Sequence, residues 1–290
     1  MEGVMILSPS CYAVSVRKPN KSIKTQVTSL KKTNAKWKQL PFIRGSINLV
    51  RMLSIGMKAL AWSANEIAEK EEEKISKKEM TLTITASLLL AIGIFLLVPY
   101  ILTEWIGFKE IEKPFLFNII DGIIRIAFFV IYIWAISFMD DIKRMFQYHG
   151  AEHMAIHCYE HKQELTTKNV SKFTTLHPRC GTAFLLIVLI VAILVFSTIP
   201  SIVLSFYPHF ATFSKWIQKP ILFIIRLFFF PIIAGVAYEL LKASDKYKGN
   251  ILLRAFSMPG LWLQKITTQK PSKDQIEVAI ASVKAALRKS

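Results

Sequence analysis

The chain has 290 residues, of which 52% are hydrophobic and 20% charged, and 20 are phenylalanine. This apolar content excludes a protein that is disordered over most of its length, and three cysteines are too few for a disulfide scaffold. Lys and Arg (37) exceed Asp and Glu (20), giving a net charge of +17. That charge predicts an anionic neighbour, such as lipid headgroups or nucleic acid.

The apolar residues are concentrated in a few segments. A hydrocarbon layer of about 30 Å is crossed by roughly 20 helical residues. No charged region leads an early apolar stretch, so a cleaved signal peptide is not expected. Four segments are long and apolar enough to span: 80–101, 117–139, 182–199 with a possible continuation to 207, and 221–241.

The basic residues outside these spans predict the orientation. Residues 1–80, 140–181 and 242–290 together hold 31 Lys and Arg, whereas 102–116 and 208–220 hold four. Because basic loops stay in the cytoplasm, we expect both termini and 140–181 inside. Cys11, Cys158 and Cys180 then face a reducing compartment and should be thiols.

Within 1–79, the alternation at 11–17 and 23–27 around Pro19-Asn20-Lys21-Ser22 predicts a β-hairpin. The basic segment 30–38 suits either a solvated linker or contact with headgroups or RNA phosphates. Residues 42–64 have helical apolar spacing, typical of an amphipathic helix at the inner interface or one packed on the protein's own core. The stretch 66–79 is charged and predicts a solvated helix.

The predicted fold is therefore mainly α. We expect a polytopic membrane protein with a four-helix transmembrane domain at 80–241 and a cytoplasmic His-rich loop at 140–181. The region 1–79 supplies the cytoplasmic hairpin, the basic segment and the amphipathic helix. The tail 242–290 is expected to be cytoplasmic and to contain a short amphipathic helix at 274–287.

Charged residues also occur inside the spans. Asp121 and Arg125 stand four residues apart, so a structural ion pair on an inward face is expected. Arg226 lies near the outer third of the fourth span, where we expect its side chain to reach toward the interface.

A histidine stripe is the strongest chemical signal. His149, His153, His157 and His161 recur every fourth residue and therefore share one helix face. His149 to His153 read H-x-x-E-H, the spacing of inverted zincins, in which two His bind zinc and the Glu activates water.

Further ligands are expected at the same membrane level. His177 and Cys180 precede the third span, and Glu239 stands near the inner end of the fourth. By the predicted topology these groups converge on His149 and His153. A structural polar network or a solvated helix face are the alternatives to a metal site. Should Glu239 lie elsewhere, His157 and Glu160 are the next candidates.

At these residues the chain resembles the YqhQ-like bacterial integral membrane proteins, a family of unknown function described as predicted metal-dependent enzymes. The resemblance implies four spans in the bacterial inner membrane but supplies no substrate. It departs at the start, where relatives usually carry more residues before Glu2. The matching stretches are 3–5, 8–9, 12–14, 17–19, 41–45, 146–153, 177–182, 234–235, 238–239, 259–264 and 267–268.

Two functions follow from these features. The first is a metal-dependent hydrolase with a divalent ion, expected to be zinc, and Glu152 as general base. Arg179 or Tyr148 would stabilise an oxyanion, and the substrate would be a membrane lipid or a membrane-associated peptide. The second is a non-enzymatic accessory factor beside the protein-export channel and the ribosome, with a structural His cluster. Metal transport would need ligands near the bilayer midplane, where the spans offer few.

Overall fold

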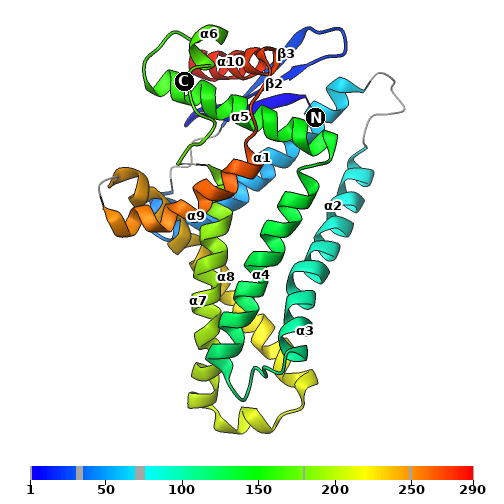
Figure 1. Cartoon of the computed structure of the whole chain (residues 1–290), viewed down its shortest axis with the longest axis vertical. Helices are drawn as coiled ribbons and strands as arrows, with labels where there is room; N and C mark the ends of the chain where they lie inside the picture. Colours follow the sequence, from blue (N-terminus) through cyan, green and yellow to red (C-terminus); the bar gives the residue numbers. More distant parts are fainter. Residues whose placement is uncertain (1, 31–34, 69–75, 179, 248–249, 290) are drawn as a thin grey trace.

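The computed structural model describes residues 2–30, 35–68, 76–178, 180–247 and 250–289. Most of them are helical, and three strands form one sheet. Figure 1 shows an elongated molecule in which long helices extend from one polar end that also holds both termini. Three predictions fall partly or wholly outside the described residues, namely Arg179, residues 31–34 of the basic segment 30–38 and residues 69–75 of the charged stretch 66–79.

The predicted hairpin is present, and a third strand joins it to form one sheet. Strands β2 (Cys11–Arg17) and β3 (Ile23–Ser29) pair antiparallel, and β1 (Gly3–Leu7) pairs with the other edge of β2. Lys21 closes the turn with φ of 65°, and its N–H donates to the Lys18 carbonyl at 2.8 Å. The sequence had suggested no strand at 3–7.

The side chains of β2 alternate between the two faces of the sheet, as predicted. Val14 and Val16 face helix α1 (Ile43–Ile67), where they pack with Ala59. Ala13 faces the opposite side and packs against α5 (Asp140–Glu160) and α10 (Lys273–Arg288), with the short α6 (Thr167–Val170) beside them. A three-stranded sheet is too small to be stable alone, so helices on both faces complete its core.

Among the described residues, four helical segments are long and apolar enough to cross a membrane. They extend side by side from the polar end in Figure 1. The first is composite, and no residue of its 18-residue apolar core is fully buried, although Phe95 contacts three aromatic rings of the second segment. The segments are α2 (Lys77–Ile92) continued by the π-helical turn η3 (Gly93–Leu97) and α3 (Val98–Trp105); α4 (Pro114–Ile136); α7 (Gly181–Phe206); and α8 (Lys215–Lys246).

Two helices lie between the spans and the sheet domain, namely α1 and α9 (Ile251–Thr267). The sequence predicted α1 and α10 but not α9. Helix α1 packs on α8, and α9 packs on α7 and α8. Two short 3₁₀ turns complete the fold, η1 (Lys36–Gln39) and η4 (Pro208–Thr212).

The charged groups inside the spans are paired. Arg125 donates to Asp121 at 2.7 Å, which confirms the predicted ion pair. The Arg226 side chain was expected to extend toward the interface, but it is held among the helices instead. It forms an ion pair with Glu110 and donates to Asn118 Oδ1 at 2.8 Å. The buried Glu110 carboxylate, only 5% exposed, explains why the guanidinium stays among the helices.

Candidate metal centre

Helix α5 carries three histidines of the predicted stripe, His149, His153 and His157, and the fourth, His161, is its C-cap residue. Its first turn contains Asp140 and Asp141, which favour a helix start because they complement the positive end of the helix dipole. Gly150 sits inside the stripe where the chain after α9 crosses: a Cβ there would lie 2.1 Å from the Gln269 carbonyl oxygen. The absence of a side chain at Gly150 therefore lets the 267–269 segment lie directly against the histidine helix.

His149, His153 and Cys180 form the first potential ligand group. One donor atom from each lies within 4.8 Å of the others. His149 Nε2 is 3.2 Å from Cys180 Sγ, and the two imidazole centroids are 4.5 Å apart. His153 and Cys180 are each only 5% exposed. Two predicted His ligands and one predicted Cys ligand therefore lie together. The histidines belong to α5, and Cys180 directly precedes α7.

The protein fixes the tautomer of both histidines. His149 Nδ1 lies 2.8 Å from the Thr267 carbonyl oxygen, and His153 Nδ1 lies 2.5 Å from the Thr175 carbonyl oxygen. Since a carbonyl oxygen can only accept, Nδ1 must carry the proton in each ring. Each neutral ring then has its lone pair on Nε2. Metal-binding histidines are oriented by this same second hydrogen bond.

Gln264 holds the backbone that carries these groups. It is fully buried on α9, and its side-chain amide receives the His177 N–H at 2.8 Å and donates to the His177 carbonyl at 2.9 Å. At Gly260 a Cβ would lie 2.5 Å from Ala183 Cβ, so α9 approaches the first turn of α7 closely. Helix α9 therefore positions both the His177–Cys180 segment and the Thr267 carbonyl.

Glu152, the predicted general base, lies on α5 beside His149. Its side chain is partly buried, and burial raises its pKa, while the neighbouring His149 acts in the opposite direction. Among the described residues no hydrogen bond or ion pair engages its carboxylate. A carboxylate with a raised pKa beside a histidine is a candidate proton acceptor.

A second ligand group lies further along the same stripe. Donor atoms of His157, Glu160 and His177 lie within 4.8 Å of one another. His177 Nε2 is 3.4 Å from Glu160 Oε2. Burial lowers the pKa of His177 to about 4, partly offset by the Glu160 carboxylate. His177 was predicted as a ligand beside His149 and His153; it contacts His153, with ring centroids 5.6 Å apart, but its donor atoms group with His157 and Glu160.

Two other predicted site residues have different partners. Tyr148 donates its hydroxyl to Glu2 at 2.7 Å, and Arg144 pairs with the same carboxylate. The Tyr148 hydroxyl thus anchors the N-terminal strand to α5, in place of the oxyanion role that the sequence suggested.

Glu239 was expected next to the histidines, and the structure pairs it with Arg44 of α1. Arg44 Nε donates to Glu239 Oε1 at 2.6 Å, and a second contact joins its Nη2 to the other oxygen. Neither ligand group found among the described residues includes Glu239. Arg44 lies on α1, 195 residues before Glu239, so the order of the spans does not predict this pair. Arg44 and Glu239 belong to two stretches that carry the family resemblance, and that was the available signal.

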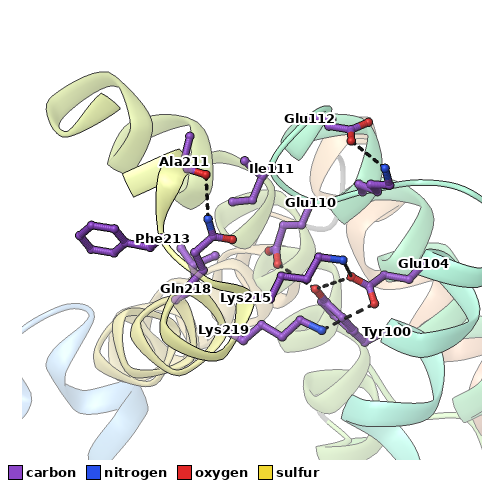
Figure 2. A pocket seen from close by; sticks show the side chains of 12 residues that line it. Tyr100, Glu104, Glu110, Ile111, Glu112, Ala211, Phe213, Lys215, Gln218 and Lys219 are labelled. Atoms are coloured by element: carbon purple, nitrogen blue, oxygen red, sulfur yellow. Dashed lines mark hydrogen bonds and ion pairs between the residues drawn. The ribbon is translucent and has the colours of Figure 1, made fainter. Parts of the chain in front are cut away.

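Two cavities accompany these features. One of about 250 Å³ is lined by Ser137, Phe138, Lys143 and Gln269. Gln269 also contacts α5 at Gly150, next to His149. The other, of about 370 Å³, lies at the opposite end of the spans, where Figure 2 shows Lys215 and Lys219 directed at Glu104 beside Tyr100. The smaller cavity is therefore the one near the histidine groups.

Comparisons with known proteins agree with the resemblance. A family model described as "Protein of unknown function (DUF1385)" matches residues 40–289. The chain is also 32% identical over 310 residues to "Uncharacterized protein YqhQ" of Bacillus subtilis (strain 168), covering 99% of this chain and 90% of that protein. No solved structure matches.

Proposed function

Because this chain belongs to the DUF1385 family of proteins of unknown function, whose description supplies no activity, we propose from its geometry that it is a membrane-embedded metal-dependent hydrolase. His149, His153 and Cys180 would hold the ion. One observation carries the proposal: both imidazoles have Nδ1 engaged by a backbone carbonyl, so each ring's Nε2 is available for the ion beside a thiol.

The donor set favours zinc. Imidazole nitrogen and cysteine sulfur are its usual ligands, and three protein ligands with a fourth position open are typical of catalytic zinc, whereas structural zinc takes four. Zinc bound here would supply Lewis-acid chemistry toward a carbonyl or phosphoryl oxygen. The protein's part is to orient the rings through the Thr267 and Thr175 carbonyls, so that little reorganisation accompanies binding.

Glu152 is the proposed general base. It follows His149 by three residues on α5 and is partly removed from water, which raises its pKa toward the range where a carboxylate accepts a proton efficiently. A Glu152→Gln substitution removes the proton acceptor and keeps the side chain's shape.

The proposed substrate is a membrane lipid or a membrane-associated peptide. The ligand groups lie where α7 begins and α4 has just ended, at the polar end of the spans. The cavity beside Gln269 is lined by Ser137 and Phe138 from the end of α4 and by Lys143, a combination of apolar and basic groups suited to a headgroup. The 31 basic residues on this side, against four on the other, support a bacterial inner-membrane location, cytoplasmic termini and anionic headgroups as neighbours.

A second candidate is an accessory factor with a structural metal or polar cluster. The observation in its favour is burial, because His153 and Cys180 are almost closed to solvent. The net charge of +17 would suit contact with ribosomal RNA beside the export channel. Basic excess on the inner side is expected of membrane proteins in general, so charge supports this candidate less than burial does.

One experiment distinguishes the hydrolase from the accessory factor. The purified, zinc-loaded protein is placed in vesicles of bacterial phosphatidylethanolamine and phosphatidylglycerol containing a labelled transmembrane peptide, and cleavage products are detected by mass spectrometry. Glu152→Gln should keep the metal and lose cleavage, whereas Glu164→Gln, an exposed carboxylate outside both groups, should cleave like the wild type. Equal products with wild type and Glu152→Gln, or no cleavage by metal-loaded wild type, would favour the accessory factor.

A further inference from the structure

We infer that His157, Glu160 and His177 form a second, separate divalent-metal site on the same helix. One donor atom from each of these three residues already lies within 4.8 Å of the others. The imidazole centroids of His157 and His177 are 4.7 Å apart, and the Glu160 carboxylate is 3.4 Å from His177 Nε2. Two imidazoles and a carboxylate are an established set of three protein ligands for catalytic zinc.

The orientation of His157 supports this assignment. Its Nε2 lies 2.8 Å from the Leu176 carbonyl oxygen and must therefore donate its proton there. The neutral ring then carries its lone pair on Nδ1, the reverse of His149 and His153. A backbone carbonyl thus fixes the tautomer of a histidine of this group too, and Nδ1 is the nitrogen that would bind an ion.

The two groups are offset along α5, although the rings of His153 and His177 are neighbours with centroids 5.6 Å apart. The midpoint of His157 and Glu160 lies 7.5 residues beyond the midpoint of His149 and His153, which corresponds to about 11 Å along a helix that rises 1.5 Å per residue. Ions in a two-metal catalytic centre are about 3.5–4 Å apart. We therefore assign two single-ion sites with different donors, one containing the Cys180 thiol and one containing the Glu160 carboxylate.

The second site also differs from the first in its solvent exposure and in the position of its ligands on the chain. Glu160 is exposed at the end of α5, whereas His177 is only 6% exposed and belongs to the segment before α7. An ion would link α5 to that segment from the solvent side, and a ligand set with an exposed carboxylate should exchange its ion faster than the buried thiolate set. This inference does not depend on hydrolysis, because binding at His157, Glu160 and His177 can be measured without a substrate.

Cobalt(II) distinguishes the sites, because only the Cys180 site can give a thiolate-to-cobalt charge-transfer band. Metal-free full-length protein in detergent is titrated with cobalt chloride. We expect the charge-transfer band to saturate at one equivalent and the d–d absorption to continue rising to two. His157→Ala and Glu160→Gln should each stop the d–d rise at one equivalent while keeping the charge-transfer band.

His161→Ala is the matched control. His161 belongs to the same stripe but is exposed, and its Nδ1 is engaged by the His157 carbonyl 2.8 Å away. It should bind two equivalents like the wild type. Saturation of wild type at one equivalent with the charge-transfer band present would overturn the second site, as would two equivalents in a folded His157→Ala protein. A protein that binds two ions and cleaves nothing would refute the hydrolase alone.

Discussion

The hydrogen bonds that orient His149 and His153 depend on a side chain that contacts neither. Gln264 fixes both polar backbone groups of His177 inside the protein, and this holds the 175–180 segment against α5. Replacing one member of such a buried pair leaves two backbone groups without partners, and each unsatisfied group costs about 1–3 kcal/mol. The metal centre and the stability of this segment should therefore respond together to a change at residue 264.

Gln264→Leu should lower the free energy of unfolding by about 2–6 kcal/mol, because the leucine keeps the volume but offers no hydrogen bonds. It should also weaken zinc binding, since the Thr175 carbonyl and Cys180 lie on the loosened segment. Thermal unfolding and zinc affinity in detergent measure the two effects. Gln163→Leu, at an exposed glutamine, is the control and should change neither. An unchanged melting temperature in Gln264→Leu would contradict the account.

The Arg44–Glu239 ion pair leads to a different expectation for residue 239. Its carboxylate is bound by Arg44 from α1, with side-chain exposures of 21% and 26%. We expect Glu239→Gln to destabilise the protein yet change zinc affinity by less than about twofold, whereas removing an outer-shell partner of a metal ligand costs about 10–100-fold. Arg44→Gln combined with Glu239→Gln should be non-additive in a double-mutant cycle of stability. A large loss of zinc affinity in Glu239→Gln would return this residue to the metal site.

At this scale, periodicity predicts part of the candidate metal centre. His149, His153 and Cys180 could be predicted because a four-residue repeat and a common membrane level bring them together. Arg44 and Gln264 could not, because each meets its partner across long sequence separations and nothing in local periodicity identifies a contact between helices. The carbonyls of Thr175 and Thr267 are backbone groups, which side-chain motifs do not reveal.

At the scale of elements, glycines decide how closely the helices pack. At Gly235 of α8 a Cβ would lie 2.1 Å from the Phe42 carbonyl oxygen, and at Gly45 of α1 a Cβ would lie 2.7 Å from Tyr238 Cβ. Small residues at a helix crossing let two backbones approach, as in many membrane helix pairs. This contact brings Arg44 to Glu239 and sets α1 across the end of α8 (Figure 1).

Gly235→Ala should separate α1 from α8. Because the added methyl would collide with backbone, which cannot rotate away, we expect a loss of about 1–3 kcal/mol or more, measured as a lower melting temperature in detergent. Gly56→Ala is the matched helical control, since nothing lies within 4 Å of a Cβ there. It should raise stability by about 1 kcal/mol through helix propensity. Equal melting temperatures for the two variants would show that the close approach does not contribute.

Two elements escaped sequence prediction for identifiable reasons. Helix α9 contains Pro259 and Gly260, both of which usually interrupt a helical pattern, but tertiary packing on α7 keeps the helix continuous. Strand β1 has only five residues and is followed by Ser8-Pro9, so its period is too short to recognise. The spans, α1, α5 and α10 were predicted because their apolar or histidine periods extend over many turns.

At the scale of the whole molecule, the polar end is assembled from three separate regions of the chain. The sheet near the N-terminus, α5 between the second and third spans, and α10 near the C-terminus share one core. An even number of spans is required for all three to meet on one side. The fold and the 31-to-4 division of basic residues therefore predict the same topology.

Reporter fusions test that topology. A fusion after Glu110 should be active only with a periplasmic reporter, and one after Thr166 only with a cytoplasmic reporter. The reason is that residues 102–116 carry two basic groups and 140–181 carry six, and basic loops are retained inside. Reporters on the same side at both positions would contradict the four-span arrangement.

The most direct test of the central claim is the zinc retained by the purified protein after zinc loading and extensive dialysis. We expect about one tightly held ion in the wild type and its loss in Cys180→Ser, because the thiol completes the group of His149 and His153. Cys158→Ser is the matched control, because Cys158 is also a buried free thiol but donates to the Gln163 and Glu164 carbonyls. The Cys158→Ser protein should retain the ion. Wild-type protein that holds no zinc, or a folded Cys180→Ser protein that holds as much as wild type, would contradict the proposed centre.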